Sequence, residues 1–358
     1  MRVLFLSNSS GGMYMFRREV IEEIAKANEV FLCFPQGRFS DYWETIGCTY
    51  IPFDFDHRTT NPFSGIRQIK EYKRILRKIK PDICFTYTIK PNIYGGAACA
   101  SLGIPYAANI TGLGTAVENA GLLQKFSILL YRWGMRKAKK VFFQNAENRD
   151  FMLKHKVIKC PHDLLPGSGV NLQQYQVVPY PNDGITRFVF VARIMKEKGI
   201  DQYLEAAKSI LTRHSDVEFH IFGFCDQGYE DKLKMFQEQG VITYHGATSN
   251  MREVYGMASC TVHPTYYPEG MSNVLLESCA CGRPIITTDR AGCREVVEDG
   301  INGFVVKQRD SADLIDKIEK FLKLSFEERK RMGLAGRRKV EREFDRQIVI
   351  NKYLETLK

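Results

Sequence analysis

The chain has 358 residues, of which 44% are hydrophobic and 26% are charged, and its formal net charge is +10. This composition fits a soluble globular protein, and the length exceeds what one hydrophobic core usually supports, so two domains are expected. The ten cysteines form no C-x-x-C pair and the seven histidines do not cluster with them, which favours buried, reduced thiols over a metal site.

The positive charge is concentrated in the first half of the chain. Residues 1–175 contain 24 Lys and Arg against 14 Asp and Glu, whereas residues 176–358 contain 27 of each kind. A basic half indicates an anionic partner, such as a membrane surface, a nucleic acid or a phosphorylated substrate; a surface that only aids solubility is the alternative. No nucleic-acid-binding motif is present, so we expect no nucleic-acid partner.

The first half alternates apolar runs with helical patterns. An apolar run at 3–6 precedes small residues and glycines, a helical pattern and a second apolar run at 30–34, which predicts a strand–helix–strand unit and a parallel sheet. Further strands are expected at 83–86, 106–109 and 141–144, and further helices at 93–102 and 121–138.

Two segments resemble targeting or membrane sequences only superficially. The N-terminal apolar run is too short for a signal peptide and has no cleavage signal. Residues 91–117 carry no charge, but prolines and glycines interrupt them, whereas a spanning helix needs about 20 mostly apolar residues. We therefore expect a buried helix, a strand and a glycine loop there.

The alternation restarts after a polar, proline-containing stretch that follows residues 166–170. Strands are then expected at 187–191, 218–222, 260–263 and 284–287, and helices at 199–213, 272–281, 311–323 and 326–357. The predicted fold class is α/β, with two doubly wound domains at 1–175 and 176–342 and a C-terminal helix at about 343–358 that packs back on the first. Such sheets bind ligands at the carboxyl ends of their strands, so a cleft between the domains is expected.

The segment P-E-G-M-S-N-V-L-L-E places Glu269 and Glu277 at either side of an expected helix start. Ser272 is a candidate N-cap, and the free N–H groups of a first helical turn suit a diphosphate. Glu277 could accept hydrogen bonds from two ribose hydroxyls, and Glu269 could do the same for a sugar. The segment thus suits a nucleotide sugar; an ordinary capped helix with a surface glutamate is the alternative.

Cations at the end of another strand favour the nucleotide sugar. Arg193 lies at the carboxyl end of the expected strand at 187–191, two residues beyond it, and Lys196 and Lys198 lie just before the next helix. Transfer of a sugar develops negative charge on the departing phosphate, which fixed cations stabilise. Lys196 also fits a simple solvated lysine.

With these residues the chain resembles the family 4 glycosyltransferases of the GT-B fold. The resemblance covers essentially the whole chain and rests on the pair Glu269 and Glu277, on V-A-R-I-M-K-E-K-G at 191–199, on C-G-R-P-I-I-T-T-D-R-A-G-C-R-E-V-V at 281–297 and on D-G-I-N-G-F-V-V at 299–306. It is most similar to the branch that builds bacterial capsule, O-antigen and lipid-linked glycans.

The resemblance implies a retaining hexosyltransferase that uses a sugar nucleotide, usually a UDP-sugar, without a catalytic metal. It implies that Arg193 and Lys198 hold the donor diphosphate, that Glu277 holds the ribose and that Glu269 holds the transferred sugar. The other residues implied to contact the donor or to line the cleft are Gly270, Met271, Ser272, Asn273, Gly11 and Gly12.

One loop departs from the family pattern, in which many members carry a histidine near the reacting sugar. The loop reads N-I-T-G-L-G-T over residues 109–115 and has no histidine. Asn109, Thr111 and Gly112 are candidates for contact with sugar or acceptor, but none is a good general base at neutral pH. We therefore expect same-face transfer, with the leaving phosphate taking the acceptor proton.

Asp54 and Asp56 form a D-x-D pattern. In another transferase fold, this pattern is the signature of a site that binds a metal and a diphosphate. Here it lies in the domain not expected to bind the nucleotide, so a solvated loop is favoured. The activities left open as alternatives are a UDP-sugar epimerase on the same fold and a non-catalytic nucleotide-sugar-binding partner.

Two basic segments are candidates for membrane contact. Residues 64–80 predict an amphipathic helix, and residues 121–140 combine Trp133 with R-K-A-K-K. The face of the first helix expected to pack on its domain consists of Ile66, Ile69, Tyr72, Leu76 and Ile79. The expected acceptor is a polyprenyl-diphosphate-linked saccharide, and the expected location is cytoplasmic, on the inner face of the plasma membrane.

Overall fold

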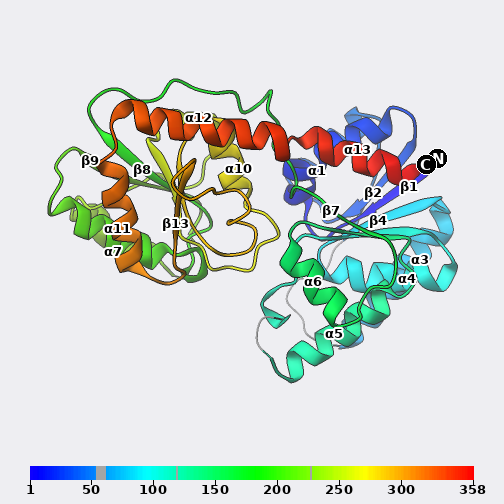
Figure 1. Ribbon diagram of the computed structural model, residues 1–358. Helices are drawn as coiled ribbons and strands as arrows, with labels where there is room; N and C mark the ends of the chain where they lie inside the picture. Colours follow the sequence, from blue (N-terminus) through cyan, green and yellow to red (C-terminus); the bar gives the residue numbers. More distant parts are fainter. Residues whose placement is uncertain (54–61, 118–119, 226–227) are drawn as a thin grey trace. The chain divides into compact units, whose positions relative to one another are not determined.

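The computed structural model describes residues 1–53, 62–117, 120–225 and 228–358. The chain divides into two compact units (Figure 1). Unit 1 comprises Met1–Gly169, Pro268–Met271 and Gln347–Lys358, and unit 2 comprises Val170–Tyr267 and Ser272–Arg346. Unit 1 first ends at Gly169, six residues before the predicted boundary at 175, and unit 2 ends at Arg346, four residues after the predicted boundary at 342. The sequence did not predict that the short segment Pro268–Met271 belongs to unit 1.

The described part of unit 1 is built on a parallel sheet with strand order β3-β2-β1-β4-β5-β6-β7. Its strands are β1 (Arg2–Leu6), β2 (Glu29–Phe34), β3 (Thr49–Pro52), β4 (Ile83–Tyr87), β5 (Tyr106–Ile110), β6 (Lys140–Phe143) and β7 (His162–Leu164). Its α-helices are α1 (Ser10–Ala25), α2 (Tyr42–Thr45), α3 (Pro62–Ile79), α4 (Gly96–Leu102), α5 (Leu122–Met135), α6 (Ala146–Lys154) and most of α13 (Arg346–Leu357).

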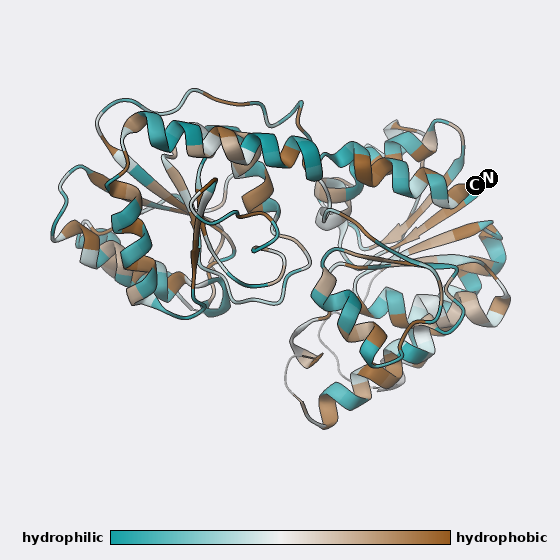
Figure 2. Cartoon of the chain, viewed as in Figure 1, coloured by the Kyte–Doolittle hydropathy of each residue, from teal (hydrophilic) through white to brown (hydrophobic). Residues whose placement is uncertain are grey.

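Helices cover both faces of this sheet, because successive side chains of a strand point to opposite sides. Leu4 and Leu6 of β1 belong to the core formed with α3, α4 and α5. Val3 and Phe5 belong to the core formed with α1 and α13. Figure 2 shows the strands largely in tan and brown, on the hydrophobic side of the scale, as expected for strands buried on both faces.

The described part of unit 2 has a parallel sheet with strand order β10-β9-β8-β11-β12-β13. Its strands are β8 (Thr186–Val191), β9 (Val217–Phe222), β10 (Thr243–Tyr244), β11 (Cys260–His263), β12 (Ile285–Thr288) and β13 (Gly303–Val306). Its α-helices are α7 (Ile200–Leu211), α8 (Glu230–Glu238), α9 (Met251–Met257), α10 (Asn273–Ala280), α11 (Ser311–Leu322) and α12 (Phe326–Glu343).

Both sheets follow the order of a dinucleotide-binding α/β sheet, in which the chain moves to one side of the first strand and then to the other. This confirms the predicted fold class of two doubly wound α/β domains. The strand order reverses between β1 and β4 in unit 1 and between β8 and β11 in unit 2. Ligands of such sheets bind outside the carboxyl ends of the strands at the reversal.

The C-terminal helix α13 is tied to unit 1 by a buried polar network. Val349, Ile350 and Tyr353 lie in the core shared with α1. The Tyr87 hydroxyl donates a hydrogen bond to the Tyr353 hydroxyl at 2.9 Å, and the Tyr353 hydroxyl donates to the side-chain carbonyl of Asn109. These bonds connect the end of the chain to the carboxyl end of β5.

The packed face predicted for α3 is wrong at one position. Tyr72, Leu76 and Ile79 are buried and Ile69 is partly buried, but the side chain of Ile66 is 54% exposed. Ile66 lies roughly a third of a turn away from the other residues when successive positions advance by about 100°.

None of the helices in the described ranges is long and apolar enough to cross a membrane.

Candidate active site

Arg193 and Lys198 converge on the aromatic ring of Tyr267 in unit 2. The Arg193 guanidinium carbon lies 5.6 Å from the ring centroid and the Lys198 ammonium nitrogen lies 4.9 Å from it. Both cations follow β8, and Tyr267 follows β11, the strand paired with β8. The two cations therefore lie at the reversal of strand order, where an anionic ligand of such a sheet is expected.

Backbone contacts fix the loop that carries these cations. The N–H of Tyr266 donates to the carbonyl oxygen of Glu197 at 2.9 Å, and the Thr265 hydroxyl donates to the same oxygen at 3.3 Å. Gly199 has a φ of +79°, and a Cβ there would lie 2.2 Å from the carbonyl oxygen of Pro264. Only glycine fits this close approach, which explains the glycine that closes the cation-bearing segment.

The start of α10 holds polar groups that lack partners. Ser272 has extended backbone angles and occupies the N-cap position, but its side chain makes no capping hydrogen bond. Within the described part of the chain, the side-chain oxygens of Ser272 and Asn273 are buried without a hydrogen-bond partner. An unsatisfied buried oxygen costs about 1–3 kcal/mol, and the N–H groups of the first turn attract anions. The start of α10 is thus suited to bind the phosphate or hydroxyl groups of a ligand.

Glu277 lies in α10, on the first turn after this start, and is partly buried. The Tyr255 hydroxyl donates to its carboxylate at 3.2 Å, and the Tyr175 hydroxyl bonds to the same carboxylate. Burial raises the pKa of Glu277 to about 7, although the two hydroxyls and the charge of Arg346 act to lower it. A carboxylate that titrates near neutral pH beside unpaired polar groups is typical of a functional site.

Glu269 lies in the segment Pro268–Met271, which belongs to unit 1. The Asn145 side-chain amide donates to the carbonyl oxygens of Glu269 at 3.1 Å and of Gly270 at 2.7 Å. Asn145 is also the N-cap of α6, where its side-chain oxygen accepts from the N–H of Asn148 at 2.8 Å. One asparagine therefore starts a helix and fixes the backbone next to the predicted sugar-binding glutamate.

Gly270 lies against the loops that follow β5 and β6. A Cβ at this position would lie 2.2 Å from the side-chain oxygen of Gln144 and 2.5 Å from the carbonyl oxygen of Thr111. Gly112 has a φ of +145°, and a Cβ there would lie 3.4 Å from the carbonyl oxygen of Pro268. Two of the predicted contact residues, Thr111 and Gly112, thus lie beside the segment that carries Glu269, whereas their contact with a sugar stays a prediction.

Asn109 has a different environment from the one predicted. Its side chain is 2% exposed, its amide donates to the carbonyl oxygen of Thr86 at 3.2 Å, and its oxygen accepts from the Tyr353 hydroxyl. Its backbone carbonyl accepts from the Asn92 side chain at 2.8 Å. Asn109 therefore connects β5 to its neighbours, and its burial leaves no support for a direct sugar contact.

The remaining predicted residues lie at the starts of helices α1 and α10. Gly11 and Gly12 follow β1, and the N–H of Gly12 donates to the hydroxyl of the N-cap Ser9 at 3.0 Å. A Cβ at Gly11 would have no neighbour within 4 Å among the described residues. Met271 is buried and directly precedes the N-cap of α10.

The described ranges contain no group of three or more His, Cys, Asp or Glu able to hold a metal ion. Asp54 and Asp56 of the D-x-D pattern lie outside the described residues. Eight of the ten cysteines are buried, as predicted, and Cys160 and Cys225 are partly exposed, whereas the reduced state of the thiols stays a prediction.

Sequence reasoning missed four residues of the site. Tyr267 and Tyr255 lie in segments that give no local sign of a role. Asn145 follows a strand and precedes a helix, so its N-cap position was detectable, but its bond to a segment more than 120 positions away was not. Tyr175 was placed at the domain boundary rather than beside Glu277.

Two family models match the chain. Glycosyl transferases group 1 matches residues 178–339, and Glycosyl transferase 4-like matches residues 2–145. The chain belongs to the family 4 glycosyltransferases of the GT-B fold, as the motifs predicted, and it is therefore a glycosyltransferase.

Similar proteins include an N,N'-diacetylbacillosaminyl-diphospho-undecaprenol alpha-1,3-N-acetylgalactosaminyltransferase of Campylobacter jejuni, which is 25% identical over 99% of this chain and 98% of its own length. The capsular polysaccharide biosynthesis glycosyltransferase CapM of Staphylococcus aureus is 30% identical over 45% of this chain and 42% of its own length. The solved structure of HepE of Anabaena in complex with UDP covers 100% of this chain and 99% of its own, with a TM-score of 0.81 and 17% identity.

Proposed function

We propose that the protein is a retaining glycosyltransferase that moves a hexose or N-acetylhexosamine from a UDP-sugar to a polyprenyl-diphosphate-linked saccharide. The product belongs to bacterial surface polysaccharide or glycan biosynthesis, and the enzyme acts at the inner face of the plasma membrane. The observation that carries the proposal is the pair of cations, Arg193 and Lys198, gathered over Tyr267 where the strand order of unit 2 reverses.

The donor is held mainly by residues of unit 2. Arg193 and Lys198 bind the diphosphate, and the unpaired groups at the start of α10 bind phosphate or sugar. Glu277 accepts hydrogen bonds from the two ribose hydroxyls. Glu269 accepts hydrogen bonds from the transferred sugar. The choice of a UDP-sugar is supported by the solved structures of HepE in complex with UDP and with UDP-glucose.

The acceptor is proposed from the relative that aligns over the whole chain. Its name describes transfer to a saccharide linked through a diphosphate to undecaprenol. The excess of positive charge in residues 1–175 suits an acceptor that carries a diphosphate and resides in a membrane. The biosynthetic setting is supported in the same way by the capsular enzyme CapM.

The reaction exchanges one bond at the anomeric carbon for another. The bond from the sugar C1 to the diphosphate oxygen breaks, and a bond from the acceptor hydroxyl oxygen to C1 forms on the same face. The acceptor proton passes to the leaving phosphate oxygen, and UDP is released. Arg193 and Lys198 stabilise the charge that grows on the diphosphate, so that no metal ion is required for this purpose.

The proposal is tested by product analysis. The purified protein is incubated with individual UDP-sugars and a short-chain polyprenyl-diphosphate-linked saccharide, with and without a chelator. We expect the acceptor mass to increase by one sugar in both conditions, and proton NMR to show the anomeric configuration of the donor in the product. An inverted anomer would exclude same-face transfer, and activity lost with the chelator would exclude a metal-free reaction.

The same experiment separates the alternatives. Conversion of a UDP-sugar into its epimer without acceptor would identify an epimerase. Binding of UDP-sugars without any conversion, across all acceptors tried, would favour a non-catalytic binding partner.

A further inference from the structure

Helix α5 of unit 1 exposes a row of large apolar side chains, here called the α5 stripe. It consists of Leu122, Phe126, Leu129 and Trp133, which are between 37% and 85% exposed. Their spacing of four, three and four residues places them on one face of the helix. Ile128, Tyr131 and Met135 of α5 lie in the core of unit 1, so this domain buries a different face of the helix.

Positive side chains flank the α5 stripe on one side. Lys125, Arg132 and Arg136 are separated by seven and four residues, so they form a second row beside the apolar one. All three are exposed. The helix thus presents an apolar row edged by cations, the arrangement of a helix that lies in the interface of an anionic membrane.

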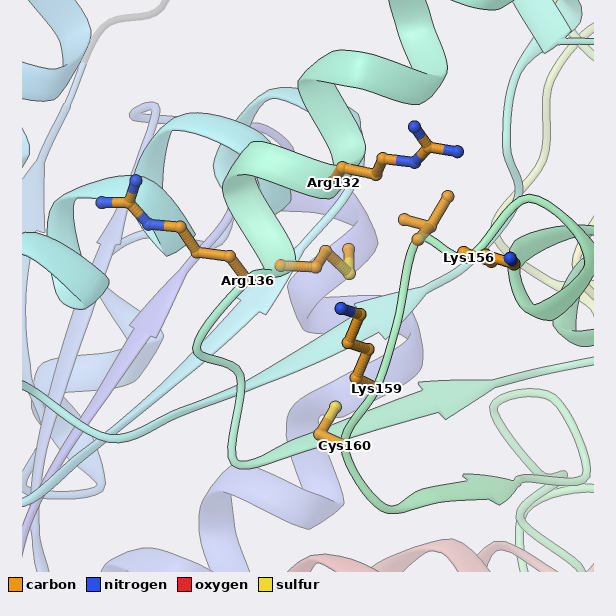
Figure 3. Close-up of a pocket in the computed structure, with 7 residues that line it drawn as sticks. Arg132, Arg136, Lys156, Lys159 and Cys160 are labelled. Carbon is orange, nitrogen blue, oxygen red and sulfur yellow. The ribbon is translucent and has the colours of Figure 1, made fainter.

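The last turns of α5 also form one wall of a basic pocket with a volume of about 530 Å³. The positive side chains that line this pocket are Arg132, Arg136, Lys156 and Lys159. Figure 3 shows the two arginines on the helix and Lys159 on the facing segment, with its ammonium group directed toward the helix. The lining residues include no acidic side chain, so the pocket has the charge and the size to hold a phosphate group.

The orientation of Arg132 is fixed by the protein itself. Its guanidinium donates two hydrogen bonds to the carbonyl oxygen of His155, at 3.1 and 2.6 Å. These bonds join α5 to the segment that carries Lys156 and Lys159. The position of Arg132 is therefore set by the fold, whereas Figure 3 shows the Arg136 side chain directed away from Arg132.

Helix α3, the other basic candidate, lacks an exposed row. Tyr72, Leu76 and Ile79 are buried in unit 1, and Ile66 is the large apolar residue of α3 that is exposed in the described part of the chain. Its cations can attract an anionic surface, but it offers little apolar area to insert.

We propose that the α5 stripe inserts into the interface of an anionic lipid bilayer and that the basic pocket binds the phosphate of an anionic phospholipid headgroup. Charge complementarity favours this occupant over a second copy of the chain, because two copies would bring the cations of the pocket edge together. The inference rests on the proposed function in that a polyprenyl-linked acceptor lies in a membrane. Vesicle binding is measured without donor or acceptor, so either proposal can fail alone.

The test is sedimentation of the full chain with vesicles of phosphatidylcholine, with or without phosphatidylglycerol. We expect binding to need phosphatidylglycerol and to weaken about tenfold or more in Phe126→Ser/Leu129→Ser, which removes apolar contact. We also expect it to weaken roughly 25-fold in Arg136→Gln/Lys159→Gln, at about fivefold per charge. The matched control, Arg77→Gln/Lys78→Gln, removes two exposed charges from α3 and is expected to stay within about twofold of the wild type.

Tryptophan fluorescence supplies a second readout. The sequence has two tryptophans, of which Trp43 is fully buried and Trp133 is 37% exposed, so a blue shift on vesicle binding reports Trp133. If the α3 control lost as much vesicle binding as Arg136→Gln/Lys159→Gln, net charge alone would explain the loss, and the proposal would be overturned. So would unchanged binding in the serine variant, or a dimer in solution that this variant dissociates.

Discussion

Replacing Arg193 or Lys198 by alanine is expected to lower kcat/KM for sugar transfer by about 10²–10³-fold, which corresponds to about 2.7–4 kcal/mol of transition-state stabilisation. Both cations lie over the same ring, at 5.6 and 4.9 Å from its centroid, so each acts on the same region of the ligand. The negative charge on the departing diphosphate grows during the reaction. The loss is therefore expected mainly in kcat, with a smaller change in KM.

Lys196 is the matched control for these two variants. It lies in the same turn, Lys196–Lys198, but its side chain is exposed and it is not among the cations over Tyr267. Lys196→Ala is expected to keep kcat/KM within about twofold, as is usual for a change at an exposed site. Equal losses at Lys196 and Lys198 would point to the general charge of the loop. Activity retained in both Arg193→Ala and Lys198→Ala would contradict the assigned donor site.

Arg283→Met is expected to lower the free energy of unfolding of unit 2 by about 3 kcal/mol or more. Arg283 is 1% exposed and donates to the carbonyl oxygens of Tyr255 at 2.7 Å, of Val178 at 3.1 Å and of Pro179 at 2.5 Å. Methionine would leave these buried oxygens without donors, and each costs about 1–3 kcal/mol. Burial lowers the pKa of Arg283 to about 10, so the side chain stays charged at neutral pH.

Urea unfolding followed by circular dichroism measures this effect. Arg283→Lys is expected to recover only part of the loss, because the three donors of an ammonium group share one nitrogen, whereas the three carbonyls are reached by three separate nitrogens of the planar guanidinium. Arg331→Met changes an exposed arginine of α12 in the same unit and is expected to shift stability by less than about 0.5 kcal/mol. If Arg283→Met unfolded at the same urea concentration as Arg331→Met, the anchoring role would be wrong.

The alternating sheets and the cation-bearing loop could be predicted because their signals are local. The strand before Arg193, the glycine after Lys198 and the helix that begins near Ser272 are each encoded within about a dozen residues. The order of elements then implied where the carboxyl ends of the strands lie. The GT-B resemblance added the roles of Glu269 and Glu277, which local spacing left open.

The features that were missed depend on contacts between distant parts of the chain. Tyr267 meets the two cations only because β11 pairs with β8, a pairing that no local pattern shows. The side-chain oxygen of Asn109 is occupied by a hydrogen bond from Tyr353, which is 244 positions away along the chain. The exposure of Ile66 and of the α5 stripe depends on which face each helix packs against the sheet. An amphipathic pattern limits that choice without deciding it.

The central claim is that unit 2 holds the ribose of a UDP-sugar through Glu277, and calorimetric titration tests it most directly. Burial places the pKa of free Glu277 at about 7, and bonds from two ribose hydroxyls would lower it in the complex. The protonated form, dominant below pH 7, must lose its proton on binding, so affinity rises with pH. We expect UDP-N-acetylgalactosamine or UDP-glucose to bind about tenfold more tightly at pH 8 than at pH 6.

A UDP-sugar is preferred to UDP as the ligand because its phosphates lack the second ionisation near pH 6 that a terminal phosphate has. Glu277→Gln is expected to bind more weakly at pH 8 and to show almost no change between the two pH values. This pair of results would support the assigned donor site. Affinity that is the same in Glu277→Gln and the wild type, with the same pH dependence, would contradict it.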